Sequence, residues 1–140
     1  ANIVHATSTT AMYADLAERY ATDTPVETGE VVSLGGKEEI TKCMDDKSDA
    51  VFGVVSDHPA YLMNSEAGNN DTHPAIALKG RVPVKVTGKG SAGDRIVSGS
   101  YGTARVAQAG EATTFNTLGR LIKDKYNEET ALTECVIGVK

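Results

Sequence analysis

The stretch GRVPVKVTGKGSAGDRIVS, residues 80–98, decides the fold class that we expect for this chain. Two sets of side chains alternate along its first half: the apolar Val82, Val84 and Val86, and the second set Arg81, Pro83, Lys85 and Thr87. A period of two places the sets on opposite faces of a half-buried β-strand. The glycine-rich residues 88–93 then predict a tight turn, and Ile96–Val97 predicts a return strand.

The same pattern extends in both directions from this stretch. Roughly nine short apolar runs, separated by turn residues, predict β-strands spaced about ten residues apart. These runs are residues 30–34, 38–43, 50–55, 75–78, 81–86, 95–98, 103–107, 118–123 and 131–139. Gly35-Gly36 predicts a hairpin turn, and Lys79-Gly80 predicts a bulge or bend between two strands. We therefore expect an all-β (β-rich) fold, a compact barrel- or sandwich-like domain.

One segment near the N-terminus has a different period. Residues 8–20 are rich in alanine and end shortly before Pro25. Within them Met12, Leu16 and Tyr20 recur every four residues, which is the spacing of one helix face. We therefore expect a short N-terminal helix of about three turns before the strands begin.

The size and charge of the chain exclude several classes of protein. A length of 140 residues suits one domain that buries a core without disulfide staples. The net charge is −5 and no run of basic residues occurs, which argues against a nucleic-acid-binding surface. No apolar run approaches the roughly 20 residues of a membrane-spanning helix. The chain begins at Ala1 without an initiator methionine, which suits a processed N-terminus or a piece of a longer protein. The first ten residues resemble a tail rather than the start of a core, which favours the piece.

The two cysteines, Cys43 and Cys135, each lie in an apolar alternating run. We expect them as small buried thiols rather than as a disulfide or a catalytic nucleophile. A catalytic cysteine needs nearby cations or a helix N-terminus to lower its thiol pKa, and the neighbouring sequence supplies neither.

Several short groups of residues resemble catalytic or metal sites but lack the required spacing. Ser56, Asp57 and His58 are adjacent, and neighbours on a strand point to opposite faces, so they do not form a catalytic triad by themselves. His58 and His73 lie near acidic residues without the spacing of a metal site. We therefore expect no enzyme activity, no metal and no cofactor.

Five motifs occur in an order that resembles one known family. They are ADLAERY (residues 14–20), GEVVSLGGKEEIT (29–41), GVVSDHPAYLMN (53–64), IALKGRVPVKVTG (76–88) and GDRIVS (93–98). Together they closely resemble a domain found near the C-termini of bacteriophage tail-fibre proteins, over about residues 14–107. The segments LGRLIKDK (118–125) and ECVIGVK (134–140) depart from the family's pattern.

The resemblance implies a module of a homotrimeric fibre that attaches the phage to its host, hence a virion component made in the host cytoplasm. Residues 1–20 would be the end of the fibre shaft with a connecting helix, and residues 21–140 the globular fibre head. Apolar side chains of the N-terminal segment would then bury against their copies around a three-fold axis. The expected trimer contacts are Ile3, Val4, Met12 and Leu16. A helix packed on its own barrel is the alternative.

In the first of two candidate functions, the chain is a non-catalytic fibre head. It would bind a bacterial surface polysaccharide or an outer-membrane receptor through exposed loops, without binding nucleic acid or inserting into a membrane. The loop residues expected to contact that receptor are Asn69, Asn70, His73, Lys89, Tyr101, Lys125 and Tyr126.

In the second candidate function, the chain is a self-cleaving intramolecular-chaperone domain that assists fibre trimerisation. The stretches DLAERY and GVVSDHPA resemble such domains of phage appendages. Self-cleavage needs a nucleophile or an acid pair near the bond that breaks, and Asp15, Ser56 and Asp57 are the candidate residues. A polysaccharide depolymerase is a third class, but this chain is too short for the long β-helix that usually carries it.

Overall fold

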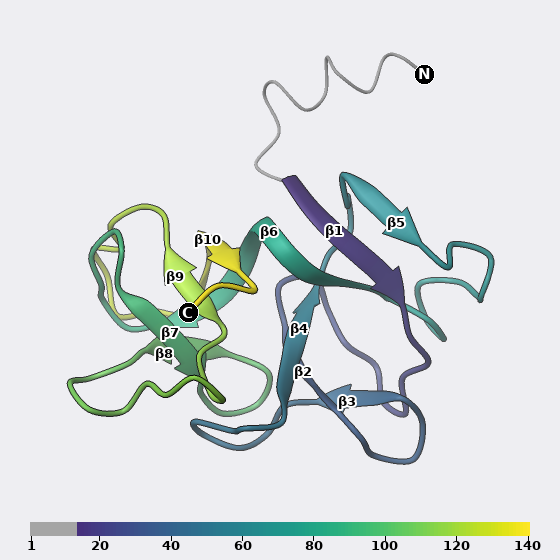
Figure 1. The fold of residues 1–140 in the computed structure, drawn as a ribbon, viewed down its shortest axis with the longest axis horizontal. Helices are drawn as coiled ribbons and strands as arrows, with labels where there is room; N and C mark the ends of the chain where they lie inside the picture. Colours follow the sequence, from purple (N-terminus) through teal and green to yellow (C-terminus); the bar gives the residue numbers. More distant parts are fainter. Residues whose placement is uncertain (1–13) are drawn as a thin grey trace.

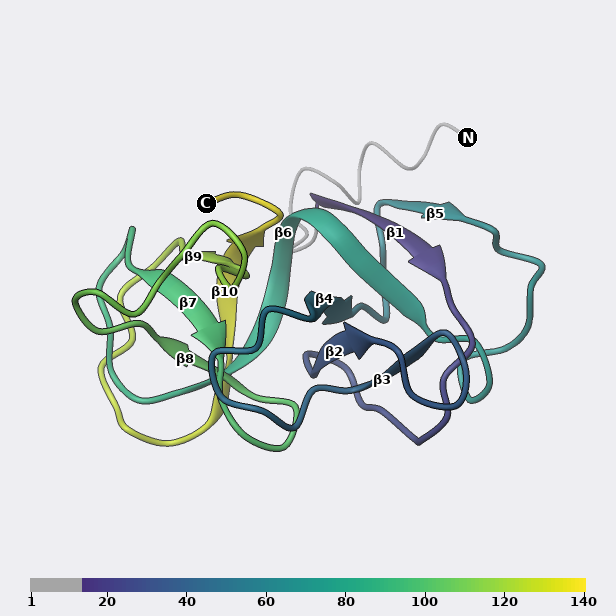
Figure 2. The same ribbon diagram turned by 60° about the horizontal axis from the view of Figure 1, so that its bottom comes forward.

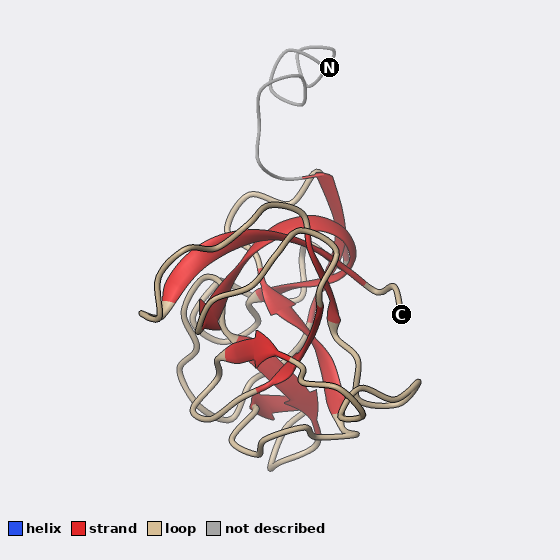
Figure 3. Ribbon diagram, turned by 90° about the vertical axis from the view of Figure 1, so that its left-hand side faces the viewer, coloured by secondary structure: helices blue, strands red, loops and turns tan. Residues whose placement is uncertain are grey.

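The computed structural model describes residues 14–140, which form ten β-strands. The strands are β1 (Ala14–Arg19), β2 (Val31–Leu34), β3 (Ile40–Lys42), β4 (Val51–Val55), β5 (Tyr61–Met63), β6 (Ala75–Thr87), β7 (Arg95–Ser98), β8 (Ala104–Val106), β9 (Gly119–Leu121) and β10 (Ala131–Ile137). Strands and loops alone make up these described residues (Figure 3). The predicted all-β class is therefore confirmed.

Five of the strands close into a small barrel. β6, β8, β7, β9 and β10 pair in that order, and β10 pairs back with β6 to complete the ring. Closure removes the free sheet edges that would otherwise expose unpaired backbone groups. The apolar side chains of the predicted alternation, Val82, Val84 and Val86, are fully buried and help to fill the barrel interior.

The long strand β6 belongs to both halves of the molecule (Figures 1 and 2). Its second half lies in the barrel, whereas its first half pairs with β1 and β4. β4 continues through β2 to β3, and β5 runs parallel to β1. A second apolar cluster fills this half and consists of Val32, Ile40, Val55 and Ile76, with Tyr20, Val26, Phe52 and Leu78 packed against it.

Gly80 lets β6 bend between the two halves. The sequence predicts two strands interrupted at Lys79-Gly80, and the structure shows one continuous strand that bends there with φ of +112° at Gly80. The start of β1 pairs with β6 at this point, and a Cβ on Gly80 would overlap the carbonyl oxygen of Ala14. Glycine is thus required both by the positive φ and by the close approach of β1.

The predicted helix is corrected over residues 14–19, which form β1. Asp15 and Ala17 are buried while Ala14 and Leu16 are exposed, which is a period of two. Pairing with β5 and β6 outweighs the helical spacing of the apolar residues, because tertiary pairing overrides local propensity. The rest of the predicted helix lies outside the described residues, as do Ile3, Val4 and Met12.

Cys43 and Cys135 are both free and buried, so the prediction of two buried thiols is confirmed. Cys135 is fully buried in the barrel, and burial, with a smaller effect of the Glu134 charge, raises the pKa of its thiol to about 12. A thiol with so high a pKa is protonated at neutral pH and behaves as an apolar core side chain.

Candidate functional site

Two buried polar side chains, Asp15 and Ser56, face each other where β1 begins and β4 ends. Asp15 lies opposite Gly80 in the pairing of β1 with β6, and Ser56 directly follows Val55. Asp15 is 2% exposed and Ser56 is 3% exposed. Within residues 14–140, Asp15 Oδ2 and Ser56 Oγ are buried and form no hydrogen bond of ordinary geometry, although the Ser56 hydroxyl lies close enough to affect the pKa of Asp15. Buried polar groups are seldom left unpaired, so this pair is a candidate functional site.

The surroundings of Asp15 favour its protonated form. Burial raises the pKa of its carboxyl, and the charge of Asp57 adds to the increase. The Ser56 hydroxyl and the backbone amide of Ala60, which donates to Asp15 Oδ1 at 3.2 Å, lower the pKa by less. Asp15 therefore keeps a proton to higher pH than an ordinary aspartate, as an acid-base group requires.

Ser56 and Asp57 also line a small cleft of about 320 Å³. Its other walls come from residues 26–28 and from Asn70, Asp71, Pro74 and Ala75. Asp57 and His58 point to solvent and lie 3.1 Å apart between Oδ1 and Nδ1, whereas Ser56 points inward. Ser56 and the adjacent Asp57 and His58 therefore point to different sides of the chain.

The loop of residues 64–74 is organised around Arg19. The Arg19 guanidinium donates to the carbonyl of Ser65, to Asn70 Oδ1 and to the carbonyl of His73. Asn69 Oδ1 accepts from the backbone amides of Asp71 and Thr72. The predicted receptor residues Asn69, Asn70 and His73 are thus brought together in one loop, where the Asn69 and Asn70 side chains already make internal hydrogen bonds.

The other predicted receptor residues lie in three loops. Lys89 is exposed in the turn after β6, and Tyr101 is 71% exposed in the turn between β7 and β8. Tyr126 is 81% exposed at the tip before β10. Lys125 is buried instead, and its ammonium donates to the carbonyl and side chain of Asn127 and to the carbonyl of Glu129. Lys125 therefore shapes the tip and leaves Tyr126 exposed on it.

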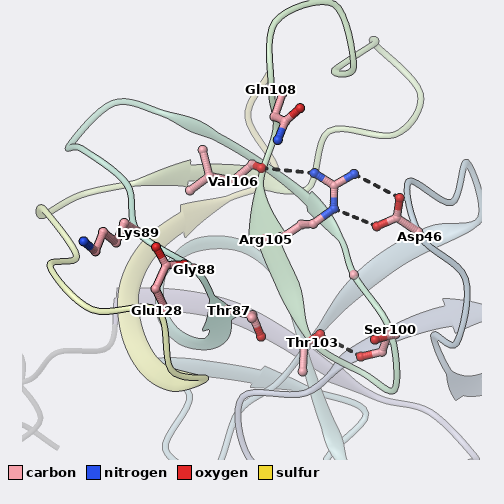
Figure 4. Close-up of a pocket in the computed structure, with 11 residues that line it drawn as sticks. Asp46, Thr87, Gly88, Lys89, Ser100, Thr103, Arg105, Val106, Gln108 and Glu128 are labelled. Atoms are coloured by element: carbon pink, nitrogen blue, oxygen red, sulfur yellow. Dashed lines mark hydrogen bonds and ion pairs between the residues drawn. The ribbon is translucent and has the colours of Figure 1, made fainter.

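A larger open basin lies between the turn after β6 and the turn between β7 and β8 (Figure 4). We call it the Arg105 basin. Its volume is about 650 Å³, and it is lined by Asp46, Thr87, Gly88, Lys89, Gly99, Ser100, Thr103, Arg105, Val106, Gln108 and Glu128. Lys89 is the predicted receptor residue within this lining.

Sequence reasoning missed the roles of Arg19 and Arg105. The Arg105 guanidinium binds Asp46 and Glu111, and Arg19 binds residues about fifty positions away. Arg19 lies in the motif ADLAERY, but nothing in that motif indicates its partners, and no motif includes Arg105; each arginine acquires its partners only when the sheet forms.

The described residues 14–140 hold no group of three or more His, Cys, Asp or Glu side chains that could bind a metal ion. Within the same residues, no helix is long and apolar enough to cross a membrane.

No family model matches this chain, and no curated protein sequence matches it. Its fold is instead similar to solved structures of phage proteins. One is the C-terminal fragment of bacteriophage phi29 gene product 12, with a TM-score of 0.62 and 15% identity over 90% of this chain and 100% of that fragment.

Two further phi29 structures have the same fold. The N base of head fiber gp8.5 gives a TM-score of 0.52 at 13% identity, covering 86% of this chain and 92% of that one. The pre-mature gene product 12 gives 0.62 at 15% identity over 91% of this chain, which spans 22% of that longer protein. At these identities the likeness is one of fold.

Proposed function

We propose that this chain is a structural domain of a bacteriophage fibre that assists trimer assembly and attachment to the host surface. The observation that carries the proposal is the fold, which is similar across the whole of a phi29 gene product 12 fragment and most of a head-fiber base. In this account the domain is part of the virion and contributes through its surfaces rather than through catalysis.

Assembly of a trimer accounts for an apolar patch at the start of the described chain. Leu16 on β1 is exposed and lies opposite Tyr61 on β5, which is exposed too. This Leu16–Tyr61 patch lies close in sequence to Ile3, Val4 and Met12, which would join it around a three-fold axis. Burying the patch against its copies removes apolar surface from water and so favours association.

Sedimentation velocity on matched variants tests this assembly. Leu16→Glu places a charge in the patch and is expected to shift the chain from trimer to monomer, because an unpaired carboxylate resists burial. Leu34→Glu is the control, since Leu34 is an exposed leucine at the end of β2. A monomeric wild-type chain, or equal sedimentation of both variants, would contradict the role of the patch.

A second candidate function is self-cleavage of an intramolecular-chaperone domain. Two observations favour it. Asp15 Oδ2 and Ser56 Oγ are buried next to each other without a hydrogen bond within residues 14–140, and the fold is similar both to a separate C-terminal fragment and to a longer pre-mature protein. Here the Ser56 hydroxyl would attack the carbonyl carbon of the scissile peptide bond while the ionised Asp15 carboxylate, made more basic by its raised pKa, takes the hydroxyl proton. Asp15 would pass that proton to the departing amine as the C–N bond breaks, and water would then hydrolyse the ester on Ser56.

Expression of a chain extended upstream tests this second function. Self-cleavage predicts two bands, with intact-mass spectrometry locating the broken bond, and one band after Ser56→Ala or Asp15→Asn. Asp94→Asn is the control, because Asp94 is an aspartate of the turn before β7, away from this pair. A single full-length band from the wild-type parent would contradict self-cleavage.

A further inference from the structure

Arg105 forms one wall of the Arg105 basin and has no donor left for a ligand. Its Nε and Nη2 donate to the two carboxylate oxygens of Asp46 at 2.7 and 2.9 Å. Its Nη1 and Nη2 donate to the carboxylate oxygens of Glu111 at 2.8 and 3.2 Å, and Nη1 also donates to the carbonyl of Val106. A guanidinium has five N–H groups, so this arginine is saturated.

Other polar side chains of the basin have no partner within residues 14–140. They are the Lys89 ammonium, the Glu128 carboxylate, the Gln108 amide and the Ser100 hydroxyl. Figure 4 shows Lys89 and Glu128 on the left of the view, Gln108 at the top and Ser100 at the lower right. These unengaged groups comprise one positive and one negative charge with two neutral groups, so the basin offers both donors and acceptors without a net charge.

A second cleft of about 370 Å³ adjoins the basin at Lys89. It is lined by Lys89, Gly90, Ser91, Asp124, Lys125 and Tyr126, and we call it the Tyr126 cleft. The internal hydrogen bonds of Lys125 hold the tip, and the exposed Tyr126 ring stands on that tip. Because Lys89 lines both hollows, one extended ligand can occupy the two together.

We propose that the Arg105 basin and the Tyr126 cleft together bind an uncharged oligosaccharide, such as a neutral stretch of a bacterial surface polysaccharide. Sugar hydroxyls both donate and accept, which matches the unengaged ammonium, carboxylate, amide and hydroxyl. The exposed ring of Tyr126 provides a flat apolar face for a pyranose, while its hydroxyl donates to Asp124 Oδ2 at 3.3 Å. Polyanionic saccharides fit less well, since among residues 14–140 Lys89 is the one unpaired cation that lines these hollows.

This inference rests on the proposed attachment function and is tested by an array of immobilised bacterial surface polysaccharides with neutral, acidic and zwitterionic repeats. The wild-type chain is expected to bind neutral polysaccharides. Lys89→Ala and Tyr126→Ala are each expected to weaken this binding roughly tenfold or more, as loss of a central contact does. Lys37→Ala is the control, because Lys37 is an exposed lysine in the β2–β3 turn.

Thermal unfolding checks that each variant keeps the wild-type fold, as expected for exposed side chains. The inference is overturned if the wild-type chain binds no arrayed saccharide, binds acidic ones alone, or binds equally well after both substitutions. Light scattering on the same samples distinguishes a failure of the saccharide site from a failure of the proposed trimeric fibre domain. A trimer without saccharide binding overturns the site alone, whereas a monomer contradicts the trimeric fibre domain whatever the array shows.

Discussion

Arg105 and Asp46 form a two-point ion pair although 59 positions separate them in the sequence. The same guanidinium binds Glu111, so one side chain of β8 fixes the loop before β4 and the loop after β8. Lys47 lies 3.6 Å from Glu111 and extends this network. The rim of the Arg105 basin is therefore held by charge pairs rather than by apolar packing.

The Arg105 network predicts a loss of stability in acid. Hydrogen bonds from Arg105, followed in importance by the amide of Gln108, lower the pKa of Glu111 to about 2. A carboxyl with a lowered folded pKa adds stability above its unfolded value of about 4.5, and loses it as the pH falls toward 2. Urea unfolding between pH 6 and pH 2 should show this loss in the wild type and a smaller one in Arg105→Met. Equal pH profiles for the two proteins would contradict the network.

The raised pKa of Asp15 predicts a contribution to folding stability with the opposite pH dependence. Because burial raises its pKa above 3.8, the stability linked to its proton is present at low pH and is lost as the pH rises through the folded pKa. Asp15→Asn removes the charge while keeping an acceptor for Ala60, so the variant should gain stability relative to wild type as the pH rises. Denaturant unfolding at a series of pH values measures the difference. A wild type that gains on the variant with rising pH would refute this reading.

Alanine substitutions at Gly80 and Gly35 test the close approach of β1 to β6 at Gly80. The φ angles of the two glycines are +112° and +118°, but a Cβ would overlap Ala14 at Gly80 and would have nothing within 4 Å at Gly35. Both alanine variants are expected to lose about 1 kcal/mol for the backbone conformation. Gly80→Ala should lose about 2 kcal/mol more from the overlap, as measured by urea unfolding. Similar losses at both positions would exclude the crowding that we infer.

Arg19 predicts the behaviour of the 64–74 loop. Its three hydrogen bonds to this loop disappear in Arg19→Met, so the loop should lose protection while the barrel keeps it. Hydrogen exchange followed by mass spectrometry should show faster exchange in peptides from this loop. Arg95→Met is the control, since Arg95 is an exposed arginine on β7. Unchanged exchange in Arg19→Met would show that other contacts hold the loop.

Much of the strand content can be predicted because its signals are local. The alternating valines at 82, 84 and 86, and the glycine turns around them, are visible within a window of about ten residues. β1 could not be predicted in this way, because the signal for it is not local. The spacing of Met12, Leu16 and Tyr20 suits a helix, whereas the pairing of β1 with β5 and β6 involves residues more than forty positions away.

For the candidate sites too, the residues can be predicted from local patterns, whereas their contacts cannot. Asp15 and Ser56 can be picked out from their motifs, but their contact depends on the pairing of β1 and β4 with β6. Lys89 and Tyr126 can be placed in turns, yet their shared cleft arises from the pairing of the turn after β6 with the tip before β10. Local sequence patterns contain no information about such pairings.

The measurement that tests the central claim most directly is the mass of this chain in solution by light scattering. A structural domain of a trimeric phage fibre should give a mass near three times the chain mass of 14.7 kDa. A mass equal to that of a single chain, at all concentrations tested, would contradict the account.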